Sequence, residues 1–170
     1  MKYVITLDGK GVDEALRGVE DMRKRLELKA DEIAQKLAEK GYETARVIIS
    51  GHVFSGSTLS GLKVEKIGDA DYVVKCESEA ILFLEFGAGL IGYGHPEPMG
   101  FGPGTYPGKG HWSDPNGWWF ETDDDRLIVR RDKDGKGIGH SYGIAPAMPM
   151  YAAHKEVEMD ILNVAKEVFA

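Results

Sequence analysis

The stretch "FLEFGAGLIGYG", residues 83–94, decides how the rest of the chain is understood, because it fits either a nucleotide-binding fingerprint or a structural junction. An apolar run is followed by Gly87, Gly89 and Gly92 in the order G-x-G-x-x-G. A dinucleotide site needs a helix directly after these glycines, so that free N–H groups meet the pyrophosphate. The next residues are "HPEPMGFGPG", whose prolines forbid a regular helix. We therefore predict no dinucleotide cofactor and interpret the glycines as the start of a loop.

Glycine and proline continue to dominate residues 87–117, and a loop of this length is uncommon inside a compact domain. Aromatic side chains are spread through it at Tyr93, Phe101, Tyr106 and Trp112. A freely solvated linker has no use for aromatic residues. We therefore interpret 87–117 as an extended loop or arm that becomes ordered against a partner.

Before this loop, apolar residues recur at helical spacing from Val12 to about Ile49, which predicts one long helix. At 1.5 Å per residue this helix is roughly 55 Å long, which is longer than a small domain is wide. Gly18 and Gly41 are points where it can bend. A compact body of this size cannot cover the whole apolar stripe. Part of the helix is therefore expected to meet a second copy of the chain or another partner.

The remaining pattern predicts an α+β fold in a single domain, residues 1–170. Pro149 is expected to begin a C-terminal helix whose apolar stripe includes Ile161. Both long helices are expected to pack on a small antiparallel sheet. The other expected elements are a strand at 2–7, a Ser/Gly linker at 50–61, a hairpin at 62–77, a pair of helical turns or a buried strand at 80–87, strands at 117–120 and 126–132, and a turn at 133–137.

Composition excludes several classes of protein. The 170 residues are 42% hydrophobic and 29% charged, as in an ordinary soluble protein. The net charge of −7 argues against a basic surface for sequence-specific binding of nucleic acid. A single cysteine, Cys76, excludes an internal disulfide and a cysteine-rich zinc module. The first residues carry no secretory signal and no stretch is long enough to span a membrane, so we expect a cytoplasmic protein without membrane contact.

No group of residues has the spacing of a catalytic or metal site. His95 and His111 are too far apart for a compact metal-ligand pattern. "DKDGKG" at 132–137 lacks the further acids of a calcium loop and is better explained as a hairpin turn. No serine lies in a nucleophile elbow. We therefore predict no enzyme activity, no cofactor and no metal. The alternative is a small-ligand or metal-dependent enzyme that uses loop 87–117 as a lid, and a third possibility is a monomeric binding module with the loop folded back.

Trp118 and Trp119 are adjacent, so in a strand they point to opposite faces and only one can face the core of this chain. The other tryptophan is then covered either by the long loop or by another subunit, where tryptophan is an enriched anchor residue.

Three motifs and their order resemble the neck proteins of tailed bacteriophages, described as head-to-tail joining, tail-completion or minor tail proteins. They are "LFLEFGAG" at 82–89, "GWWF" at 117–120 after the Gly/Pro-rich loop, and "APAMPMYAA" at 145–153. The family's Glu-Phe-Gly signature falls on Glu85, Phe86 and Gly87, its tryptophan pair on Trp118 and Trp119, and its proline on Pro149. The chain departs from the family at Met148 and Met150, where a basic and an aromatic residue are frequent.

The resemblance implies a structural virion protein of the neck or tail, assembled in the host cytoplasm. Such proteins form homo-oligomeric rings that join the head connector to the tail tube or tail terminator, around the channel through which DNA passes. An acidic chain suits a channel wall along which DNA slides. The residues expected at subunit interfaces or in the family motif are Glu85, Phe86, Gly87, Gly89, Tyr93, Phe101, Trp112, Trp118, Trp119 and Pro149.

Overall fold

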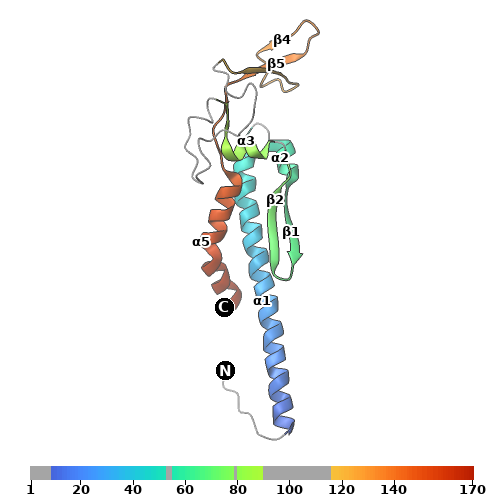
Figure 1. The fold of residues 1–170 in the computed structure, drawn as a ribbon, viewed down its shortest axis with the longest axis vertical. Helices are drawn as coiled ribbons and strands as arrows, with labels where there is room; N and C mark the ends of the chain where they lie inside the picture. Colours follow the sequence, from blue (N-terminus) through green and yellow to red (C-terminus); the bar gives the residue numbers. More distant parts are fainter. Residues whose placement is uncertain (1–8, 53–54, 79, 90–115) are drawn as a thin grey trace.

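A single helix, α1 (Gly9–Ser50), forms the long axis of the molecule (Figure 1). At 1.5 Å per residue its 42 residues span about 63 Å. The prediction of one long helix is confirmed, and α1 runs unbroken through Gly18 and Gly41, the two possible bend points. The structure is a computed structural model that describes residues 9–52, 55–78, 80–89 and 116–170. The strand predicted at 2–7 and most of the predicted arm lie outside these residues.

The second long helix, α5 (Pro149–Phe169), packs antiparallel to the C-terminal half of α1. Small residues let the two backbones approach: a Cβ atom on Gly41 would lie only 3.0 Å from Val157 Cγ2. Lys36 bridges to Glu167 across the pair at 2.6 Å. Gly41 therefore permits close packing of the two helices.

The apolar stripe predicted for α5 is correct except at one position. Ala153, Val164 and Val168 are buried, whereas Ile161 is 45% exposed. The neighbouring Asp160 turns toward α1 instead and pairs with Lys40.

A hairpin of β1 (Leu62–Gly68) and β2 (Asp71–Cys76) lies beside α1, away from α5 (Figure 1). Its turn is fastened to the middle of α1 by Asp31, which accepts hydrogen bonds from Lys66 Nζ at 2.6 Å and from the Ala70 N–H at 3.2 Å. The bond from Lys66 is the main cause that holds the pKa of Asp31 below its ordinary value. The predicted hairpin is thus confirmed.

Two short helices close the end of the body at the C-terminus of α1. The segment 50–61, expected to be a linker, contains α2 (Ser55–Gly61). This short helix leads directly into β1, and the Gly61 carbonyl accepts the N–H of Glu77 at 2.9 Å. The second helix is α3 (Ile81–Phe86), which resolves the choice between helical turns and a strand. The core beneath them contains the buried residues Ala45, Ile49, Leu62, Leu84 and Ala153.

Beyond α3 lies a separate three-stranded antiparallel sheet in the order β3-β5-β4. Its strands are β3 (Trp118–Glu121), β5 (Gly137–Ser141) and β4 (Arg130–Arg131). The strand predicted at 126–132 is shortened to β4, because Arg126 bonds back to Asp124 through its backbone N–H at 3.0 Å and through its guanidinium. These bonds lower the pKa of Asp124 to about 2.

The hairpin turn between β4 and β5 is confirmed, with Asp132 Oδ1 accepting the backbone N–H groups of Asp134 and Lys136. A short strand, β6 (Gly143–Ile144), follows β5 and leads back toward α5. The α+β prediction, with a long N-terminal helix, a C-terminal helix and antiparallel strands, is therefore confirmed, although the strands form two sheets. Within the described ranges, no helix combines the length and apolarity needed to cross a membrane.

Replacing Gly41 with leucine should lower the free energy of unfolding by about 1–3 kcal/mol, because a larger side chain must displace Val157 and separate α1 from α5. Chemical denaturation measures this change. Gly9→Leu is the control, since a Cβ at Gly9 meets nothing within 4 Å. Equal effects of the two substitutions would show that close packing at Gly41 does not matter.

Candidate functional site

The motif at 84–89 lies where α3 meets the start of α5. The carbonyl of Leu84 accepts two backbone N–H groups from the chain entering α5, that of Ala147 at 2.7 Å and that of Met148 at 3.1 Å. Leu84 itself is buried in the core. The end of α3 is therefore the point to which the chain returns before its last helix.

Glu85 caps α5 from outside that helix. Its Oε2 accepts the Met150 N–H at 2.9 Å and its Oε1 accepts the Tyr151 N–H at 2.8 Å. The N-cap residue of α5, Met148, has a left-handed backbone (φ 51°) and makes no side-chain cap of its own. A carboxylate in this position satisfies two N–H groups that lack a partner within the helix, and it complements the positive end of the helix dipole.

Glu85 as a whole residue is only 8% exposed. Burial raises the pKa of Glu85 above its ordinary value, and the two backbone hydrogen bonds oppose that rise. Both described contacts are with this chain's own backbone, so Glu85 acts as a structural cap.

The glycines after Glu85 allow two backbone segments to touch. Gly87 ends α3 with φ 76°, and Gly89 has φ 62°. Ala88 and Gly89 form antiparallel bridges to Ile144 and Gly143 of β6. A Cβ on Gly89 would lie 2.6 Å from the Tyr142 carbonyl oxygen. Gly87, Ala88 and Gly89 are all buried, so the interpretation that the arm leaves the body at Gly87 is corrected for residues 87–89.

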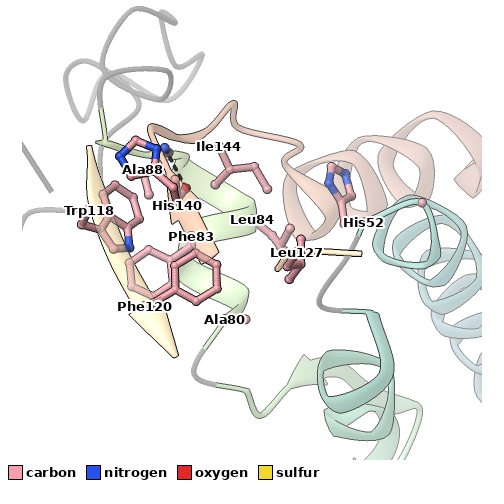
Figure 2. Close-up of a pocket in the computed structure, with 13 residues that line it drawn as sticks. His52, Ala80, Phe83, Leu84, Ala88, Trp118, Phe120, Leu127, His140 and Ile144 are labelled. Carbon is pink, nitrogen blue, oxygen red and sulfur yellow. Dashed lines mark hydrogen bonds between the residues drawn. The ribbon is translucent and has the colours of Figure 1, made fainter. Parts of the chain in front are cut away.

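A cavity of about 570 Å³ opens beside this junction, between α3 and the three-stranded sheet. Figure 2 shows the rings of Phe83, Phe120 and Trp118 gathered on one wall. His140 lies at the same end, and its Nε2 is 2.9 Å from the Asn116 carbonyl oxygen. The size and apolar lining are those of a small-molecule pocket.

The two adjacent tryptophans face opposite ways, as predicted. Trp118 lines the cavity, whereas Trp119 is 51% exposed on the other face of β3. The Trp119 ring centroid lies 4.4 Å from that of His140, and the Arg130 guanidinium lies 4.5 Å from the Trp119 ring. These contacts give Trp119 a fixed, outward-facing surface that a second molecule could cover.

Five of the residues singled out in the sequence meet at this one junction: Glu85, Gly87, Gly89, Trp118 and Pro149. Pro149 is buried as the first residue of α5, and Phe86 is half-buried at the end of α3. Tyr93, Phe101 and Trp112 lie outside the described residues.

Sequence reasoning missed the partners of these residues. The junction also includes Gly143 and the Leu84 carbonyl, and the cavity wall includes Phe120. In the sequence, Gly143 is visible only as a glycine in "SYGI" and Phe120 only as an apolar position in "GWWF".

The described residues offer little for metal or nucleophilic chemistry. In the part of the chain that the structure describes, no three His, Cys, Asp or Glu side chains group to hold a metal ion. His95 and His111 fall outside that part. Cys76 lies in β2, where burial raises the pKa of its thiol and its Sγ is 3.5 Å from the Thr58 carbonyl oxygen. A raised pKa keeps the thiol protonated, and a protonated thiol is a poor nucleophile.

Replacing Glu85 with alanine should lower the free energy of unfolding by about 1.5–3 kcal/mol, because two hydrogen bonds to a charged acceptor are lost. Glu158→Gln, at an exposed position within α5, should change the free energy of unfolding by less than about 0.5 kcal/mol. Thermal or chemical denaturation of both variants measures the difference.

The pH dependence provides a second measurement on Glu85. Because its folded pKa is raised, the native state binds this proton more tightly than the unfolded chain does. The associated stability is present below the ordinary carboxyl pKa and is lost as the pH rises through the raised folded pKa. Glu85→Gln should therefore remove this part of the fall in stability. If the free energy of unfolding changed with pH in the same way for the wild type and Glu85→Gln, the raised pKa of Glu85 would be contradicted.

Gly143→Ala should be more destabilising than Gly135→Ala by about 1–3 kcal/mol. Both glycines have positive φ, 114° and 80°, but a Cβ on Gly143 overlaps the Ala88 carbonyl while one on Gly135 meets nothing within 4 Å. Gly135→Ala therefore reports the cost of a positive φ without a steric contact, and the further loss in Gly143→Ala, measured by denaturation, reports its larger φ together with the overlap with residue 88.

The chain was also compared with protein-family models, curated protein sequences and solved structures, and none of the three gave a match.

Proposed function

We propose that the chain is a structural, non-enzymatic protein of a bacteriophage neck or a phage-derived tail-like particle. In this role it is a ring-forming adaptor between the head connector and the tail tube. The order of the motifs in the sequence suggests this family, and the surface of the structure supports an assembly role.

The observation that carries the proposal is the apolar surface exposed on both long helices. On α5, Met159 and Leu162 are each 70% exposed and Phe169 is 54% exposed. On α1, Leu16 and Val19 are 58% and 64% exposed. Single exposed apolar residues are ordinary, but rows of them along a helix are typical of protein–protein contacts.

The structural part played by the motif residues also supports the proposal. Glu85, Gly87 and Gly89 hold α3 against β6 and α5 through backbone contacts. These contacts fix the positions of the elements relative to one another. A ring subunit needs such a rigid shape more than it needs reactive groups. The exposed side of α5 then remains available for a neighbouring subunit, and Trp119 gives the three-stranded sheet an outward-facing aromatic surface.

One observation favours the alternative of a small-ligand protein or enzyme. The cavity beside α3 has a suitable volume and includes His52 and His140 in its lining. Phe83→Trp would enlarge a wall residue and reduce this space. A stoichiometric small molecule that co-purifies with the wild type and is lost from this variant would favour the alternative.

The proposed role predicts a defined assembly defect. Deleting the gene from the phage or prophage that carries it should give filled heads and separate tails, which electron microscopy distinguishes from joined particles. The double variant Met159→Glu and Leu162→Glu should fold but fail to restore joining, because it places charge on the exposed side of α5.

The control is Val129→Glu, which adds one negative charge, half that of the double variant, at a 64% exposed apolar position near β4. This control should restore joining. Normal particles after deletion of the gene would contradict the neck assignment, and full rescue by the double variant would contradict the role of α5.

A further inference from the structure

The N-terminal part of α1 extends beyond everything packed on the rest of the helix. The end of α5 lies beside Lys29, whose Nζ bonds the Val168 carbonyl and lies 4.9 Å from the Phe169 ring centroid. The hairpin turn ends at Asp31. Residues 9–28 of α1, here called the projecting segment, continue past both ends (Figure 1). At 1.5 Å per residue the projecting segment is about 30 Å long.

The projecting segment carries an apolar stripe with no cover among the described residues. Its members are between 41% and 64% exposed: Val12, Leu16, Val19, Met22 and Leu26. Their spacing of three and four residues places them on one face of the helix. The same spacing continues to Leu37 and then to Gly41, where α1 contacts Val157 of α5. The stripe therefore continues the face of α1 that α5 covers in the C-terminal half of the helix.

We propose that the projecting segment pairs with the projecting segment of a second copy of this chain, antiparallel, about a twofold axis at Val19. The intervals between the five apolar residues are the same in both directions along the helix. A twofold axis at Val19 therefore brings Val12 of one copy level with Leu26 of the other, and Leu16 level with Met22. The partner helix has the same antiparallel direction relative to α1 as α5 has, and it occupies the same face beyond the end of α5.

The charges of the projecting segment support the antiparallel direction. Each segment is acidic toward its start and basic toward its end. Residues 9–21 carry four acidic and two basic side chains, whereas residues 22–28 carry three basic and one acidic, so an antiparallel pair places the acidic part of one helix level with the basic part of the other. A parallel pair would place each charge level with its own copy, and like charges at the same level repel. The apolar pattern and the charge pattern thus select the same arrangement.

This contact does not depend on the proposed neck function. A twofold contact uses the same patch on both copies and closes after two, so it cannot by itself propagate around a ring. A ring needs a second surface, such as the exposed side of α5. The two surfaces are tested by different variants.

Sedimentation equilibrium of the purified full chain tests the pair. The wild type should have twice the chain mass of 18.7 kDa, and Val19→Glu should have the mass of one chain, because two carboxylates meet at the axis. Leu28→Glu is the control: Leu28 is 71% exposed and lies off the stripe, so this variant should remain dimeric. Circular dichroism checks that all three proteins are folded. A wild type with the mass of one chain, or a dimeric Val19→Glu, overturns the proposal.

Charge reversal tests the direction of the pair. Asp13→Lys with Glu14→Lys should weaken the dimer, as should Lys24→Glu with Arg25→Glu. All four changes together should restore it, because each acidic end again lies beside a basic end. In a parallel pair each reversal leaves like charges level, so an unchanged dimer constant in both double variants overturns the antiparallel arrangement.

Disulfide trapping in a Cys76→Ser background gives an independent readout of register. Val12→Cys and Leu26→Cys chains, mixed and oxidised, should form a mixed disulfide dimer, and neither chain alone should cross-link efficiently. Efficient cross-linking of Val12→Cys alone, without the mixed product, overturns the proposed register.

Discussion

The structure depends on one carboxylate that links two helices distant in the sequence. Glu85, at the end of α3, accepts the first free N–H groups of α5, and the adjacent Leu84 carbonyl accepts the two N–H groups before them. These four hydrogen bonds fix where α5 starts and in which direction it leaves. The packing of α5 on α1 begins close to that start, where Ala153 and Val157 lie against Gly41.

The two long helices also define what the molecule exposes. One face of α1 is covered by α5 over its C-terminal half and continues as a bare apolar stripe over its N-terminal half. The hairpin covers another side of α1 and stops at nearly the same level, at Asp31. Elements therefore pack on one end of α1, whereas the other end carries exposed apolar side chains in a row, a pattern that is typical of protein–protein contacts.

Local patterns predicted local structure well. The spacing of apolar residues identified both long helices, and alternation with a turn identified the hairpin, because each is encoded by neighbours in the sequence. The sequence did not predict α2, because this short helix depends on its contacts with α1. It also did not predict the exposure of Ile161, which accompanies the pairing of the neighbouring Asp160 with Lys40. The junction was predictable only as a motif. Its chemistry required knowing that residue 85 meets residues 150 and 151.

The junction at Glu85 has a consequence for how the chain tolerates change. The bonds from Glu85 to the Met150 and Tyr151 N–H groups close one loop of the chain, which runs from residue 86 to residue 149. The entropy of closing such a loop grows only with the logarithm of its length. A change in the length of this loop therefore alters the entropy of closure only slightly, provided that the packed contacts of Gly89, Gly143 and the three-stranded sheet remain intact. The length of this loop can thus vary without a change in the length of the two long helices.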